Sequence, residues 1–158
     1  MRRAIYPGTF DPITNGHLDI IERSTRVFDE VIIALLMNID KKPMFSIQER
    51  VEMIQQVNRW KHVKVDTFQG LLVHYAVSQK AQVIVRGIRA VSDYEYELQM
   101  ALMNRRLEPS LETVFMMSAE EYSHLSSSLI KEVFVLGGSI TGLVPQVVEE
   151  RMRSKLGR

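Results

Sequence analysis

The sequence predicts a doubly wound α/β domain, in which a five-stranded parallel sheet carries helices on both of its faces. Three observations lead to this class. Short apolar runs typical of strands alternate with helical patterns from start to finish. The run at 31–37 is apolar without interruption, as expected for a strand buried on both faces of a parallel sheet. A helix separates each strand from the next, which indicates parallel strands joined by right-handed crossovers.

The expected elements follow one another without a linker, an internal repeat or a low-complexity stretch, so residues 1–158 are expected to form a single domain. Pro7 and Gly8 end the first strand. Two helices begin at capping boxes, in which serine is followed by glutamate three residues later: Ser46 with Glu49, and Ser92 with Glu95. In chain order the elements are a strand at 3–6, a helix at 16–28, a strand at 31–37, a helix at 46–57, a strand at 63–65, a helix at 71–79, a strand at 82–85, a helix at 92–107, a strand at 113–117, and helices at 126–135 and 145–156.

Composition and charge exclude several classes of protein. The net charge of +1 provides no overall field that would favour nucleic acid or an anionic membrane. The absence of cysteine excludes disulfides, thiolate catalysis and cysteine-ligated metals. No signal peptide or membrane-spanning run is visible, and no histidines and carboxylates stand at metal-ligand spacing. We therefore expect a cytoplasmic protein that holds no metal through its own side chains.

Residues 8–17 join the first strand to the first helix, at the edge of the sheet where ligands bind in this class of fold. Gly8 permits a close turn, Thr9 offers a hydroxyl, and His17 lies in the first helical turn, where free N–H groups favour a phosphate. A histidine there can donate to charge that develops on a pentacovalent phosphorus. In the simpler alternative, Gly8 only serves a turn and His17 only caps its own helix.

Three further loops carry cations or hydroxyls toward the same edge. Lys41 follows the second strand and can neutralise phosphate as a point charge, although a solvated loop lysine fits equally well. Arg86 and Arg89 follow the fourth strand and can fork onto phosphate oxygens, or else lie on the surface. The serine triplet 126–128 opens a helix and offers hydroxyls and amides to phosphate, unless it is a plain N-cap.

The helix at 92–107 has an apolar surface wider than one face of a sheet requires. Such a helix is either buried all round or packs on another subunit, and in so small a chain we expect an oligomer. The residues concerned are Tyr94, Tyr96, Leu98, Met100, Ala101, Leu102, Met103 and Leu107.

The string from Tyr6 to Pro12, followed by Thr14-Asn15-Gly16-His17, resembles the (H/T)xGH signature of the nucleotidyltransferase superfamily. Together with the segments 41–45, 86–90 and 93–97 and the serine triplet, it makes essentially the whole chain similar to the phosphopantetheine adenylyltransferase family. The TxGH element indicates only the superfamily, whereas the stretch of the type RGxRAxxDxEYE is much more specific.

The resemblance implies transfer of the adenylyl group of ATP to 4′-phosphopantetheine, giving dephospho-coenzyme A and pyrophosphate, with Mg²⁺ bound through ATP. It also implies a homohexamer and feedback by coenzyme A. The catalytic residues that it implies are His17, Thr9, Lys41 and Arg86, and the phosphopantetheine contacts are Thr9, Lys41, Leu72 and Arg86. The implied ATP contacts are Thr9, Phe10, His17, Gly87, Ile88, Arg89, Glu97, Tyr122, Ser123, His124, Leu125, Ser126, Ser127 and Ser128.

Lys131 stands where the superfamily carries an arginine after its serine triplet. Lysine keeps the charge but lacks the bidentate fork, which leaves a phosphate contact by this residue open. The sequence has no P-loop and no GxGxxG, which excludes a P-loop kinase and a dinucleotide oxidoreductase. Two alternatives stay open: another transferase of the superfamily, such as a nicotinate-mononucleotide adenylyltransferase or a cytidylyltransferase, and a non-catalytic nucleotide-binding regulator.

Overall fold

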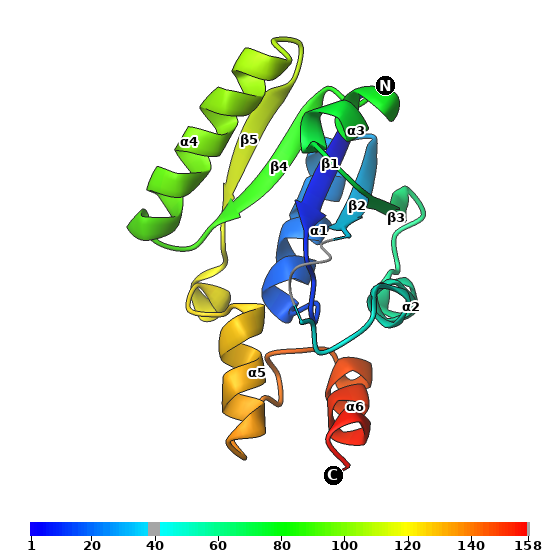
Figure 1. The fold of residues 1–158 in the computed structure, drawn as a ribbon, viewed down its shortest axis with the longest axis vertical. Coiled ribbons are helices and arrows are strands. Elements are labelled where there is room, and N and C mark those ends of the chain that lie inside the picture. The colour runs from blue at the N-terminus through cyan, green and yellow to red at the C-terminus, as the bar shows by residue number, and fades with distance from the viewer. Residues whose placement is uncertain (38–41, 158) are drawn as a thin grey trace.

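A computed structural model describes residues 1–37 and 42–157 and confirms the doubly wound α/β class (Figure 1). Its sheet has five parallel strands in the order β3-β2-β1-β4-β5, so the order reverses direction between β1 and β4. Ligands bind at such a switch point, beyond the carboxyl ends of the strands. The strands are β1 (Arg3–Gly8), β2 (Glu30–Leu36), β3 (Val63–Phe68), β4 (Val83–Ile88) and β5 (Glu112–Met117).

Helices cover both faces of the sheet. α1 and α2 pack on one face and α3 and α4 on the other, while α5 and α6 extend beyond the carboxyl ends of the strands (Figure 1). The helices are α1 (Asn15–Val27), α2 (Ile47–Val57), α3 (Leu72–Ser78), α4 (Val91–Leu107), the short 3₁₀ helix η1 (Glu120–Tyr122), α5 (Ser127–Val135) and α6 (Gln146–Lys155). Of the helices in the described ranges, none is both long and apolar enough to cross a bilayer.

The core has two parts, one on each face of the sheet. Alternate residues of β1 and β2 point to opposite faces, so Tyr6 and Ile33 join the part beneath α1, whereas Ile5 and Ile32 join the part beneath α3. Both faces of these two central strands are covered, which explains why their sequences are apolar without alternation.

β1 is longer than the sequence predicts, because it continues through Pro7 and Gly8. The expectation that these two residues end the strand is wrong. β1 pairs with β4 only at Ala4 and Ile5, whereas its pairing with β2 continues to Gly8. At Pro7 the strand therefore has one open side, where a residue without an N–H is tolerated.

The start of α4 also differs from the prediction. The helix begins at Val91 after the N-cap residue Ala90, so the predicted N-cap at Ser92 is wrong. Instead, the Asp93 carboxylate accepts a hydrogen bond of 3.2 Å from the backbone N–H of Arg89. The other predicted capping box, which opens α2, is confirmed by both of its reciprocal hydrogen bonds.

Candidate active site

His17 is held by the capping box that opens α1. The backbone N–H of Thr14 donates to His17 Nδ1 at 3.0 Å, and Thr14 Oγ1 accepts from the His17 N–H at 3.3 Å. His17 therefore does cap its own helix, as the simpler alternative states, but it uses only Nδ1 for this. Because Nδ1 accepts a hydrogen bond, the proton of the neutral ring must lie on Nε2, which leaves that atom as a donor.

The surroundings of His17 keep its ring neutral. Burial, together with the charges of Arg89 and Arg86, lowers the pKa of His17 to about 4. The ring also meets Phe10 edge-on, with 4.9 Å between the ring centroids. Near pH 7 the side chain is therefore a fixed neutral donor, whose acceptor nitrogen is already occupied. Such a group suits stabilisation of developing negative charge better than removal of a proton.

Gly8 serves a different purpose from the one that the sequence suggests. It is the last residue of β1, and the next-but-one residue, Phe10, folds back over it with a φ of 49°. A Cβ at Gly8 would lie 2.9 Å from the Phe10 ring, so only glycine leaves room for it. Phe10 is 3% exposed and packs against the His17 ring, whereas Thr9 is exposed at the edge of the sheet.

Arg86, near the end of β4, pairs with Glu97 of α4. Its Nε and Nη2 donate to the two carboxylate oxygens at 2.8 and 2.6 Å, and its Nη1 donates to the carbonyl of Pro7 at 3.0 Å. Burial lowers the pKa of Arg86, but the hydrogen bond and charge of Glu97 outweigh this effect and raise it. Arg86 therefore lies beside the β1–α1 loop, and Glu97 has both of its oxygens committed to that arginine.

Arg89 connects the start of α4 to the segment before α5. Its Nε donates to Asp93 at 3.1 Å, and its Nη1 donates to the carbonyl of Leu125 at 2.5 Å. Leu125 itself is buried, while Gly87 and Ile88 are half-buried in β4. These contacts bring the predicted residues of β4 and those before α5 to the same edge of the sheet.

The serine triplet opens α5 next to the β1–α1 loop. Ser126 is the N-cap and accepts from the Leu129 N–H at 3.1 Å, so the plain capping function is present. Ser127 Oγ donates to the carbonyl of Pro12 at 2.8 Å, and Ser128 is exposed. The free N–H groups of the first turn of α5 therefore lie beside the loop that holds His17.

η1 lies over the first turn of α1. A Cβ at Gly16 would be 3.4 Å from the Cβ of Tyr122, so the glycine lets this segment approach closely. Tyr122 is half-buried, Ser123 Oγ donates to the carbonyl of Glu120 at 2.9 Å, and His124 is exposed. The segment thus borders the same edge of the sheet as His17.

Comparisons with known proteins agree with this geometry. The family model described as cytidylyltransferase-like matches residues 5–133. The phosphopantetheine adenylyltransferase of Clostridium novyi (strain NT) is 56% identical over 159 residues, which cover 100% of this chain and 99% of the relative. The chain belongs to this family. The enzyme of the same name from Caldanaerobacter subterraneus subsp. tengcongensis is 52% identical, with 98% of each chain covered.

A solved structure shares the fold. The lipopolysaccharide core biosynthesis protein from Thermoplasma volcanium GSS1 matches with a TM-score of 0.58 and 20% identity, over 76% of this chain and 99% of that one. At this identity the likeness concerns the fold alone, and it supports the same Rossmann-like arrangement of strands and helices.

One residue that the sequence predicts for the site, Leu72, is joined to this network by none of the contacts above. Leu72 is the first residue of α3, is half-buried, and packs on the part of the core beneath this helix. Lys41 lies outside the described residues. Sequence reasoning also missed two buried residues beside the site, Asp11 and Arg50. Arg50 shares a helical face with the apolar Met53 and Ile54, and this position was a signal that it is buried.

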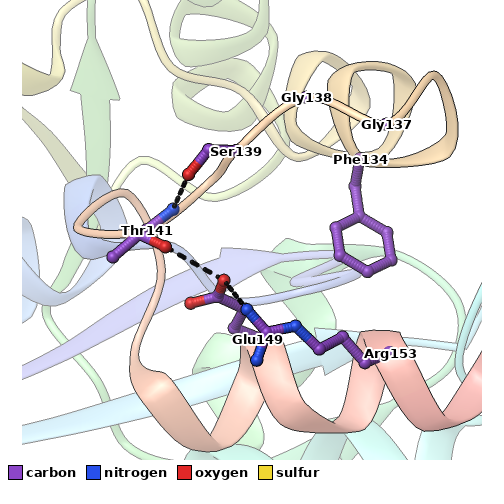
Figure 2. Close-up of a pocket in the computed structure, with 7 residues that line it drawn as sticks. All are labelled: Phe134, Gly137, Gly138, Ser139, Thr141, Glu149 and Arg153. Carbon is purple, nitrogen blue, oxygen red and sulfur yellow. Dashed lines mark hydrogen bonds and ion pairs between the residues drawn. The ribbon is translucent and has the colours of Figure 1, made fainter. Parts of the chain in front are cut away.

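The part of the chain that the structure describes contains no group of three or more histidines and carboxylates that could hold a metal ion. A cavity of about 360 Å³ does occur, but it lies between the end of α5 and α6 (Figure 2). There Glu149 accepts hydrogen bonds from Thr141 Oγ1 at 3.1 Å and from Arg153 at 2.7 Å. None of the predicted site residues lines this cavity, and its charged groups pair with each other.

Proposed function

We propose that this protein transfers the adenylyl group of ATP to 4′-phosphopantetheine, giving dephospho-coenzyme A and pyrophosphate in coenzyme A biosynthesis. The observation that carries this function is the 56% identity with a phosphopantetheine adenylyltransferase over the whole chain. The neutral donor His17, in the first turn of α1 after the loop that contacts the start of α5, supplies a chemical basis for it.

In the proposed reaction, a phosphate oxygen of 4′-phosphopantetheine forms a bond to the α-phosphorus of ATP. The bond from that phosphorus to the oxygen bridging to the β-phosphate breaks, and pyrophosphate leaves. The attacking phosphate is already an anion, so the step needs no general base. Catalysis then consists of positioning the two substrates and stabilising charge in the transition state.

The site residues divide this work. His17 donates from Nε2 to the charge that develops on the α-phosphate oxygens, and Thr9 orients the incoming phosphate. Lys41 and Arg86 neutralise charge on the phosphates. Arg86 has five N–H donors, of which Glu97 and the Pro7 carbonyl occupy three, so two stay available for a phosphate.

The remaining predicted contacts serve ATP and the acceptor. The serine triplet and the first turn of α5 hold the leaving pyrophosphate, as a helix N-terminus favours an anion. Leu72 offers an apolar contact to the pantetheine arm. The other proposed ATP contacts are Phe10, Gly87, Ile88, Arg89, Glu97, Tyr122, Ser123, His124 and Leu125.

Mg²⁺ enters this proposal bound to the phosphates of ATP, where it neutralises their charge. The carboxylates beside the site fit such an arrangement. Glu97 is occupied by Arg86, Asp93 by Arg89, and Asp11 by Lys131. Each of them already has a cationic partner, so these three carboxylates are occupied and the ion would be held by phosphates and water.

We further propose a cytoplasmic homohexamer of this single domain, under feedback by coenzyme A, which shares the pantetheine arm with the acceptor. The exposed apolar side chains of α4 support oligomer formation. The chain alone does not bury α4 all round, because Tyr96 is 62% exposed, Leu102 56% and Met103 51%. A second copy of the chain would remove this surface from water.

A pyrophosphate-release assay tests the function. ATP or CTP is offered with 4′-phosphopantetheine or nicotinate mononucleotide, and products are identified by mass spectrometry. Release only with ATP and 4′-phosphopantetheine is expected. Release with another pair identifies a different transferase of the superfamily, whereas tight ATP binding without release for any acceptor identifies a regulator.

A further inference from the structure

A buried ionic cluster of Asp11, Arg50 and Lys131 joins three segments of the proposed phosphate site. Asp11 is 3% exposed and Arg50 5% exposed. The side chain of Lys131, on α5, is 28% exposed. Burial of charges is costly unless they are paired and hydrogen-bonded, so the contacts of this cluster indicate what holds it in place.

Asp11 accepts three hydrogen bonds from two other segments. Its Oδ1 accepts from the backbone N–H of Phe45 at 2.9 Å, and its Oδ2 accepts from that of Met44 at 2.9 Å. The Nζ of Lys131 lies 3.0 Å from Oδ2. One carboxylate therefore links the β1–α1 loop to the segment before α2 and to the second turn of α5.

Arg50 reinforces the same junction from α2. Its Nη1 donates to the carbonyl of Thr9 at 2.9 Å, and its Nε donates to the carbonyls of Phe45 at 3.1 Å and Ser46 at 3.3 Å. Close by, Ser127 Oγ donates to the carbonyl of Pro12. Residues 9–12 are thus fixed on two sides, by the start of α2 and by the start of α5.

We propose that Asp11 is a positioning residue of the transferase. It holds the loop that bears Thr9 and leads to His17 in register with the N-terminus of α5, and it does not touch substrate. Lys131 acts through Asp11 and does not bind the pyrophosphate directly. This inference rests on the proposed function, because the register matters where an acceptor phosphate and a leaving pyrophosphate must lie in line.

The contacts lead to a ranking of two substitutions. Asp11→Asn keeps the shape, but its amide group presents N–H donors to a site lined by three donors, so the junction must shift. Lys131→Met leaves Asp11 with both backbone N–H partners, and the junction is largely kept. A lysine that bound phosphate directly would produce the opposite ranking.

The test compares the wild type with Asp11→Asn, Lys131→Met, the double variant and Arg151→Met. Arg151 is a matched control, because its ion pair of 3.1 Å with Glu52 also joins two segments that lie far apart in the sequence. Pyrophosphate release gives kcat, calorimetry gives the dissociation constant of ATP, and urea unfolding shows that each variant is folded. A wild type without pyrophosphate release would refute the proposed function itself, before this inference is reached.

We expect Asp11→Asn to lower kcat by about 10²-fold, as for a small misplacement, with the ATP dissociation constant changed less than about threefold. Lys131→Met should lose about three- to tenfold, the double variant no more than Asp11→Asn, and Arg151→Met nothing. Any of three results would overturn the proposal. These are a wild-type kcat in Asp11→Asn, a loss of kcat in Lys131→Met that exceeds the loss in Asp11→Asn, and losses that multiply in the double variant.

If Asp11→Asn does not unfold cooperatively, Lys131→Met decides alone. A moderately reduced kcat with unchanged ATP affinity supports a positioning function for Asp11. An ATP dissociation constant raised by about tenfold or more, or no change in either quantity, overturns it.

Discussion

Replacing His17 with alanine removes two separate hydrogen bonds, and the structure predicts a different consequence for each. The first is the bond of 3.0 Å from the Thr14 N–H to Nδ1, which closes the capping box of α1. Thr14 is 2% exposed, so water cannot easily replace the lost acceptor. We expect a loss of about 1–3 kcal/mol in the free energy of unfolding.

The second bond is the one that Nε2 donates in the transition state. Removal of one preorganised donor from an active site lowers kcat by about 10²–10³-fold, or about 2.7–4 kcal/mol. His17→Ala should therefore combine a moderate loss of stability with a large loss of kcat and a smaller change in ATP binding. The measurements are pyrophosphate release with both substrates saturating, urea unfolding, and calorimetric titration with ATP.

Glu49→Ala is the matched control, because Glu49 closes the equivalent capping box of α2 through a bond of 2.7 Å from the Ser46 N–H. It should lose about 1 kcal/mol of stability and keep its kcat. A His17→Ala enzyme with a kcat within about threefold of the wild type would refute the assignment of His17 as a transition-state donor.

The other predictions concern pH, packing and assembly. Because burial and the charges of Arg89 and Arg86 lower the pKa of His17 to about 4, kcat/KM should show no inflection from this residue above about pH 5.5. An inflection near pH 6.5 that His17→Ala abolishes would contradict this. The unfolded ring titrates near pH 6.5, so the stability of the wild type relative to His17→Ala should fall as pH drops from about 6.5 to about 4, measured by urea unfolding. Gly8→Ala places a Cβ 2.9 Å from the Phe10 ring and should lower the free energy of unfolding by about 1–3 kcal/mol; an unchanged urea midpoint would disprove the packing argument. Leu102→Glu should shift sedimentation toward smaller species, whereas the control Val27→Glu, at a 46% exposed position on α1, should not. Equal sedimentation of the wild type and both variants would exclude this face of α4 as an interface.

The elements of the fold could be predicted because their signals are local. The apolar run at 31–37 and the capping box at Ser46 each depend on residues a few positions apart, and both gave elements that the structure confirms. One error arose where a distant partner decides, because whether Pro7 ends β1 depends on how far β4 pairs with that strand. The other error, at the start of α4, is local: the contact between Arg89 and Asp93 does not follow the capping-box pattern of serine and glutamate.

The residues of the candidate site also fall into two groups: those that local sequence signals predict and those that depend on contacts between distant segments. The position of His17 at a strand-to-helix junction is visible in the sequence, and so is its capping of α1 as an alternative. The pairing of Arg86 with Glu97 is not visible, since it requires knowledge of how α4 lies against β4. The contact between Asp11 and Lys131 spans 120 positions, and no spacing rule connects residues so far apart.

The most direct test of the account is product formation by the purified wild-type protein with ATP, Mg²⁺ and 4′-phosphopantetheine. Pyrophosphate is measured enzymatically and the adenylylated product by mass spectrometry. We expect pyrophosphate and dephospho-coenzyme A to appear in equal amounts, and we expect that CTP does not replace ATP and nicotinate mononucleotide does not replace 4′-phosphopantetheine. ATP binding without pyrophosphate release, or efficient transfer to another acceptor, would contradict it.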